Sequence, residues 1–153
     1  MRSFIFAALV SIAVVFAGCK REDQKDIDEA LIVEHINANP DLAGAELTGS
    51  GLHYLIQDSG SVDRPGISNN VVVYYTGTLL DGSQFDAVNS PATPLELPLA
   101  NTILGWQEGI PFLGRGGRGV LLIPSHLGYG ATANGSIPKN SVLKFEVELV
   151  DFN

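Results

Sequence analysis

The sequence has few cysteines and few basic residues, and both shortages exclude classes of protein. Cys19 is the sole cysteine in 153 residues, so no disulfide can form within one chain. Lys and Arg together number 9, against 17 Asp and Glu, and the formal net charge is -8. Nucleic-acid binding depends on clustered Lys and Arg, so this balance argues against a nucleic-acid partner.

Motifs for covalent, metal and nucleotide chemistry are missing as well. The three histidines, His35, His53 and His126, are far apart and have no Cys or carboxylate at ligand spacing, so no metal site is predicted. There is no Ser or Cys nucleophile motif. Residues 114–119 formally satisfy G-x-G-x-x-G, but a strand is predicted after them where a dinucleotide fingerprint requires a helix, so we predict a turn. No cofactor is expected.

The one long apolar run lies at the N-terminus. It covers residues 3–18 after Arg2 and is shorter than the roughly 17–25 residues of a membrane span. Residues 1–18 are therefore predicted to be a cleaved export signal. The pair Ala17-Gly18 before Cys19 resembles the lipobox of bacterial lipoproteins, which implies an acylated Cys19 that anchors the protein to a membrane of the cell envelope. An ordinary secretory signal with an incidental cysteine is the alternative.

Residues 19–50 are predicted to be a lipid-anchored tether followed by a short helix. Residues 20–28 carry mixed charge without apolar periodicity, which is typical of a solvated tether. Asn39-Pro40 ends an amphipathic helix that could pack on its own domain or on a second copy. Residues 41–50 form a polar connection. The helix is predicted from four apolar residues near helical spacing: Ile27, Leu31, Ile32 and Ile36.

Residues 51–153 are predicted to form one domain built mainly of strands. Apolar residues alternate over 52–56 and, most clearly, over 143–149, so one face of an antiparallel sheet is buried and the other is wet. The run 120–123 is a further strand that Pro124 stops. Asn101 and Thr102 are expected to cap one short internal helix. Four or five strands with this helix predict the α+β class.

Residues 71–86, VVVYYTGTLLDGSQFD, concentrate aromatic side chains beside a single carboxylate. The stretch alternates as a half-buried strand through Tyr75, and the pattern breaks at Gly77. A turn is predicted at Asp81-Gly82, and the chain then delivers Phe85-Asp86. An apolar cup with one acid is the predicted result.

Four motifs occur in order: VYYTGTLLDGSQFD, ILGWQEGI, LGYGA and IPKNSVLKFEVELV. Together they resemble the FKBP-type peptidyl-prolyl cis/trans isomerases over roughly residues 52–152. The resemblance implies a strongly bent antiparallel sheet wrapped on a short helix, with the active pocket between them. Position by position, it implies catalytic roles for six residues: Tyr75, Phe85, Asp86, Trp106, Tyr129 and Phe145. It also implies substrate contacts from Leu95, Ile103 and Ile137.

An aromatic cup can accelerate rotation of an X-Pro amide without covalent chemistry. The barrier to this rotation is about 18–20 kcal/mol because twisting breaks amide resonance. The planar amide is more polar than the twisted one, so an apolar cup disfavours the ground state more than the transition state. A reduction of about 5 kcal/mol gives several thousandfold acceleration. Asp86 is expected to orient the wall and set the local field, not to act as a base, because no proton is transferred.

Two functions follow from this pocket. The first is an envelope foldase that isomerises prolyl bonds in exported proteins, with proline-containing polypeptides as partners and a macrolide as a competing ligand. The alternative is a proline-binding module or chaperone with little or no turnover, which Leu95 at the wall and a short loop after Tyr129 suggest. A protease-coupled peptide assay separates them.

Overall fold

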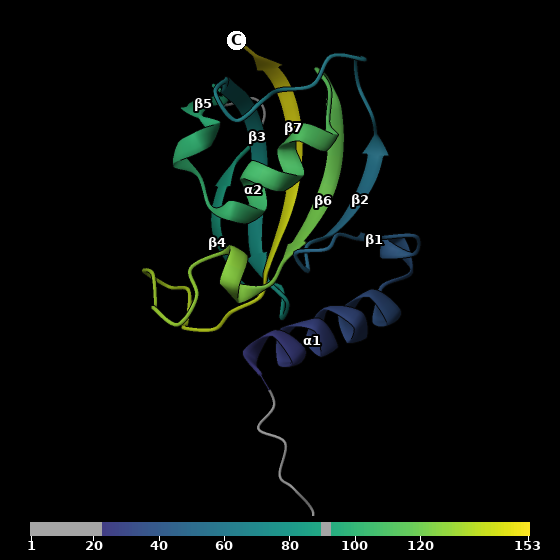
Figure 1. The fold of residues 1–153 in the computed structure, drawn as a ribbon, viewed down its shortest axis with the longest axis vertical. Coiled ribbons are helices and arrows are strands. Elements are labelled where there is room, and N and C mark those ends of the chain that lie inside the picture. Colours follow the sequence, from purple (N-terminus) through teal and green to yellow (C-terminus); the bar gives the residue numbers. More distant parts are fainter. Residues whose placement is uncertain (1–22, 90–92) are drawn as a thin grey trace, which may run out of the picture.

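The computed structural model describes residues 23–89 and 93–153. Its main feature is a seven-stranded antiparallel sheet that curves around a short helix (Figure 1). This arrangement confirms the predicted α+β class and the bent sheet. The strands are β1 (Glu46–Leu47), β2 (His53–Asp58), β3 (Asn70–Leu79), β4 (Gln84–Val88), β5 (Leu95–Pro98), β6 (Gly117–Ile123) and β7 (Leu143–Phe152).

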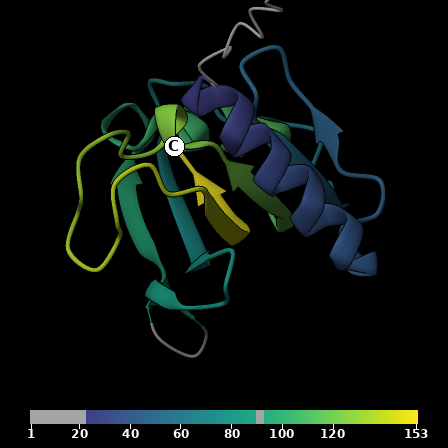
Figure 2. The same ribbon diagram turned by 90° about the horizontal axis from the view of Figure 1, so that it is seen from below.

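The helices lie on different parts of this sheet. The helix α2 (Leu104–Gly109) covers the concave face, and α1 (Gln24–Ala38) crosses one end of the sheet (Figures 1 and 2). Four short 3-10 helices join the elements: η1 (Pro40–Leu42), η2 (Leu99–Asn101), η3 (Ile110–Phe112) and η4 (Ser125–Leu127). No described helix combines the length and the hydropathy that a bilayer crossing requires. The predicted signal segment and Cys19 lie outside the described residues.

The strand order is β1-β2-β6-β7-β3-β4, and β5 also pairs with β3. The prediction of four or five strands was therefore too low. The two-residue strand β1 lies inside the segment 41–50 that we expected to be a connection, and β4 and β5 share one edge of β3. Strands this short carry too few residues to produce a recognisable alternation.

The alternation does not break at Gly77 as predicted, since burial still alternates there and Gly77 pairs with Asp86 on β4 and with Phe145 on β7. Its missing side chain has a packing reason: a Cβ there would lie 2.5 Å from the Phe85 ring and 2.9 Å from the Phe145 ring. The predicted turn follows two residues after β3. Gly82 has φ +87°, which suits glycine.

The core confirms the alternation predicted for β7. Leu143, Phe145, Val147 and Leu149 are all buried and pack with Trp106 of α2 in the main apolar cluster. A second cluster lies on the other face of β6, where Val120 and Leu122 meet Ile32 of α1. Because both faces of β6 are covered, its sequence is a continuous apolar run instead of an alternating one.

The N-terminal helix differs from its prediction in extent and in the face it buries. It begins at Gln24, so part of the expected tether is helical. Ile32 is fully buried against the sheet of its own chain, whereas Ile27 and Leu31 are 37% and 42% exposed. The helix also buries a carboxylate, Asp28, which is 0% exposed. The described part of residues 19–50 is thus packed against the body of the molecule.

The predicted caps of the internal helix are wrong. Ile103 occupies the N-cap of α2 and makes no side-chain capping bond. Asn101 belongs to η2, and the Thr102 hydroxyl donates instead to the Leu99 carbonyl at 2.7 Å. The 3-10 turn before the helix uses these polar residues, so their positions near a helix start did not identify its cap.

Candidate active site

A cavity of about 520 Å³ opens between α2, the sheet and the loop after η4. This volume lies within the usual range for small-molecule and peptide-side-chain pockets. The nine pocket residues expected from the sequence all line it: Tyr75, Phe85, Asp86, Leu95, Ile103, Trp106, Tyr129, Ile137 and Phe145. Residues from β3, β4, β5 and β7 therefore meet residues from α2 and a long loop at one place.

Four aromatic rings form the interior of the cavity. Trp106 lies edge-to-face with both Tyr75 and Phe145, with ring centroids 5.2 Å apart in each pair. Phe85 meets Phe145 in the same way at 5.5 Å. Such edge-to-face pairs add about 0.5–1.5 kcal/mol each beyond area burial, so each ring restricts the orientation of the next. The cavity is a preformed aromatic cup.

Asp86 is held at the edge of this cup by a neutral donor. The Tyr75 hydroxyl donates to Asp86 Oδ2 at 2.6 Å. Burial, and then the hydrogen bond to this carboxylate, raise the pKa of Tyr75 well above its ordinary value. The phenol therefore stays protonated at neutral pH and fixes the carboxylate without cancelling its charge.

The Ile103 backbone N–H and the Tyr129 hydroxyl belong to residues that line the cavity. The backbone N–H of Ile103 precedes the first turn of α2 and makes no hydrogen bond within residues 23–89 and 93–153. The Tyr129 side chain is 37% exposed and lines the cavity. An N–H and a phenol in these places are available to donate to carbonyl groups of a bound peptide.

The remaining wall comes from an edge strand and a loop tip. Leu95 begins β5 and is 37% exposed, whereas Ile137 is 5% exposed. Ile137 is fixed by paired backbone hydrogen bonds with Asn134, each 2.9 Å long, around Gly135 with φ +57°. The cup therefore has one open aliphatic wall and one wall that a turn secures.

Six further residues line the cavity that the sequence did not assign to the site: Leu97, Asn101, Thr102, Asn134, Gly135 and Ser136. Leu97 lies two residues after Leu95 on β5, so strand periodicity could have identified it. Asn134, Gly135 and Ser136 carried no pattern that connects them to the sheet, because only the fold of the loop brings them there.

The arrangement limits the chemistry of the cavity. Among the described residues that line it, the only ionisable groups are two phenols and the carboxylate of Asp86. The cup can bind an apolar ring, donate hydrogen bonds to carbonyls and present one negative charge. These properties suit rotation of a prolyl amide, which makes and breaks no covalent bond.

A sheet wrapped on one helix, with an aromatic cup between them, is the architecture implied by the isomerase family that the four motifs resemble. Residues 62–150 match the family model described as FKBP-type peptidyl-prolyl cis-trans isomerase. The chain belongs to this family. Family membership confirms the resemblance first found in the four motifs.

Individual relatives are similar over most of this chain. The FKBP-type peptidyl-prolyl cis-trans isomerase FkpA of Aeromonas hydrophila is 40% identical over 76% of this chain and 44% of the relative. FkpA of Escherichia coli strain K12 is 41% identical over 71% of this chain and 40% of the relative. The chain thus spans less than half the length of these relatives.

Solved structures share the fold. The crystal structure of Escherichia coli FkpA superposes with a TM-score of 0.72 at 33% identity and covers 85% of this chain and 62% of that one. A peptidyl-prolyl cis-trans isomerase from Pseudomonas syringae pv. tomato gives a TM-score of 0.73 at 27% identity, over 85% of this chain and 93% of that one.

Proposed function

We propose that this protein is a peptidyl-prolyl cis/trans isomerase that assists the folding of exported proteins. The observation that carries the proposal is the convergence of Tyr75, Phe85, Trp106 and Phe145 on one open cavity beside Asp86. Membership of the isomerase family supports the same reaction. Proline-containing polypeptides that are unfolded or partly folded are the proposed substrates.

In this mechanism, the proline ring enters the aromatic cup, and the amide bond before the proline loses its hydrating water molecules. The loss disfavours the planar, more polar amide relative to the twisted one. The Ile103 N–H and the Tyr129 hydroxyl hold substrate carbonyls, so the chain on one side of the bond stays fixed while the other side turns. Asp86, fixed by Tyr75, sets the field at the rotating carbonyl.

A protease-coupled assay on a short X-Pro peptide tests the proposal directly, with the full chain in detergent. Asp86→Leu and Phe145→Ala are expected to lower kcat/KM by about tenfold or more, which corresponds to at least about 1.4 kcal/mol of transition-state stabilisation. Asp41→Leu, an exposed aspartate outside the cavity, is the matched control and should keep the parent rate. Circular dichroism verifies that each variant is folded.

The same assay decides between turnover and binding alone. A folded parent that binds the peptide yet gives no rate above background would support the proline-binding module or chaperone. Equal rates for the parent, Asp86→Leu and Phe145→Ala would show that the assigned residues are not the site. A macrolide of the kind that inhibits this family is expected to compete with the peptide, and a rise in apparent KM measures that competition.

We further propose that the protein is a lipoprotein of the bacterial cell envelope. The support is in the sequence: an apolar run that ends in Ala17-Gly18 before the sole cysteine, Cys19. Acylation of Cys19 would hold the domain at a membrane surface. Metabolic labelling with a fatty acid should mark the protein, and Cys19→Ala should remove the label. A label that persists in Cys19→Ala would rule out this anchor.

A further inference from the structure

The carboxylate of Asp28 is buried in a place that the pocket chemistry does not explain. Asp28 lies on α1 and is 0% exposed. It does not line the cavity. Within residues 23–89 and 93–153, no cation forms an ion pair with it. A buried charge without a counterion is costly unless hydrogen bonds satisfy it, so its contacts indicate what it does.

Three donors satisfy the carboxylate, and two of them come from one residue. Asp28 Oδ2 accepts from the backbone N–H of Ser125 at 2.8 Å and from the Ser125 hydroxyl at 2.6 Å. Asp28 Oδ1 accepts from Gln24 Nε2 at 2.7 Å. Ser125 is itself 2% exposed. Asp28 therefore fixes both the backbone and the side chain of the first residue of η4.

Ser125 passes this constraint to the residues on each side of Tyr129. Its carbonyl accepts from the N–H of Gly128 at 3.0 Å and of Gly130 at 2.8 Å. The Gly130 carbonyl in turn accepts from the N–H of Asn140 at 2.7 Å. Asn140 has φ 56°, an uncommon conformation for a residue with a side chain. These bonds close the base of the loop that carries Tyr129 and Ile137.

We infer that Asp28 is a positioning residue for the isomerase site, acting through Ser125 to hold Tyr129 and the loop 125–141 against the cavity. The N-terminal helix would then support the active site, although no residue of α1 lines the cavity. The inference rests on the proposed isomerase function only in the experiments that measure kcat/KM. A misplacement of about 1 Å can cost up to a hundredfold in rate, so a second-layer carboxylate can matter to turnover.

The first experiment compares Asp28→Leu with Ile32→Ala in the full chain. Ile32 is the next buried residue of α1, is 0% exposed and packs on Val120 and Leu122 without a hydrogen bond to the loop. Both variants should lower the melting temperature. Asp28→Leu should also lower kcat/KM about tenfold, while Ile32→Ala, assayed well below its melting temperature, should stay within about twofold of the parent.

Two milder variants keep the test decisive if Asp28→Leu does not fold. Asp28→Asn retains one acceptor oxygen for the Ser125 donors and should keep most of the parental kcat/KM. Ser125→Ala removes the hydroxyl donor but keeps the N–H, so its loss should be smaller, about two- to threefold. Combining Asp28→Leu or Ser125→Ala with Tyr129→Phe should give less than the product of the two single losses, because both changes act on one contact.

A second readout does not depend on turnover. Hydrogen exchange should become faster at the amides of Gly128 and Gly130 in Asp28→Leu and unchanged in β4. Peptide affinity can be followed by the fluorescence of Trp106, the sole tryptophan, which lines the cavity. Should the parent show no turnover, the proposed function fails, and exchange and affinity still decide the role of Asp28.

Two results would overturn the inference. One is parental kcat/KM and parental loop exchange in a folded Asp28→Leu variant of an active protein. The other is an Ile32→Ala variant that reproduces both changes at the same loss of melting temperature, since the effect would then be general destabilisation of α1.

Discussion

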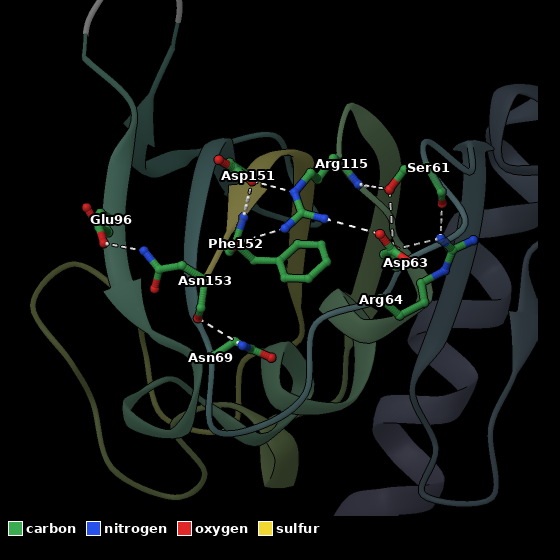
Figure 3. A network of polar contacts seen from close by, with 9 residues as sticks. All are labelled: Ser61, Asp63, Arg64, Asn69, Glu96, Arg115, Asp151, Phe152 and Asn153. Atoms are coloured by element: carbon green, nitrogen blue, oxygen red, sulfur yellow. Dashed lines mark hydrogen bonds and ion pairs between the residues drawn. The ribbon is translucent and has the colours of Figure 1, made fainter.

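Strand β7 carries two buried phenylalanines, and the surroundings of their rings differ. Phe145 lines the open cavity, with Trp106 and Phe85 at its edges. Phe152, at the other end of the strand, is covered by the guanidinium group of Arg115, whose carbon lies 3.9 Å from the ring centroid (Figure 3). Both rings are buried, but a side chain of the protein covers the Phe152 ring, whereas the Phe145 ring lines a cavity.

The two ends also differ in how a carboxylate is paired. Arg115 Nε lies 2.5 Å from Asp151 Oδ1, and this contact lowers the pKa of Asp151 below its ordinary value. Asp63 and the Phe152 carbonyl contact the same guanidinium group (Figure 3). At the cavity, the carboxylate is held by the neutral phenol of Tyr75. Arg115 therefore pairs with two carboxylates, whereas no cation of the described residues pairs with the carboxylate of Asp86 at the cavity.

The largest difference is expected from matched substitutions of the two rings. Phe145→Leu should lower kcat/KM about tenfold or more, because it removes a wall of the cup and the edge-to-face contacts with Trp106. Phe152→Leu should leave kcat/KM within about twofold while lowering the free energy of unfolding by about 1–2 kcal/mol. Peptide assays and urea unfolding measure the two quantities. Equal losses of kcat/KM in Phe145→Leu and Phe152→Leu would show that the two rings do not differ in function.

Gly77 tests whether the cup depends on close ring packing. Alanine at this position would place a Cβ within 2.9 Å of both the Phe85 and Phe145 rings, so both rings must move. We expect Gly77→Ala to lose about 1–3 kcal/mol of unfolding free energy and several-fold in kcat/KM. Gly82→Ala is the control. It meets open space but has φ +87°, so it should cost about 1 kcal/mol without affecting activity.

Strand alternation and a turn predicted only part of the cavity, namely the aromatic residues beside Asp86 in residues 71–86. The other residues that line it were predicted from the resemblance that the four motifs carry. The N-terminal helix could not be delimited in the same way. Its buried face includes Asp28, and a pattern of apolar residues counts a carboxylate as exposed. Ser125, which satisfies Asp28, is 97 residues away in sequence. Long-range hydrogen bonds of this kind leave no periodicity, so the support of the loop could only be found in three dimensions.

Ionisation of Tyr75 offers a smaller test of the cavity. Its folded-state pKa is raised by burial and by Asp86. Above the ordinary tyrosine pKa of about 10, the unfolded chain releases a proton that the folded chain retains, so the free energy of unfolding should fall as pH rises. Tyr75→Phe should make this alkaline decline shallower. Urea unfolding between pH values on each side of 10 measures it, and identical slopes in parent and variant would contradict the assignment.

Tyr54→Phe is the comparison for this measurement. The Tyr54 hydroxyl donates to Glu46 at 2.9 Å in a solvent-exposed contact, and this bond is the main cause of its raised pKa. Solvent screens such an exposed pair, so Tyr54→Phe should change the alkaline slope less than Tyr75→Phe does.

The smallest effect is expected at the Arg115 cluster. Arg115→Gln removes the ion pairs with Asp63 and Asp151 and the cation over Phe152. Because the side chains of Arg115, Asp63 and Asp151 are 41%, 80% and 61% exposed, the loss of unfolding free energy should be small and should shrink with added salt. Arg115→Lys keeps the charge but not the planar fork, so part of the loss should remain. Activity should stay parental in both variants, and a fall in kcat/KM would mean that this end of β7 is coupled to the cup.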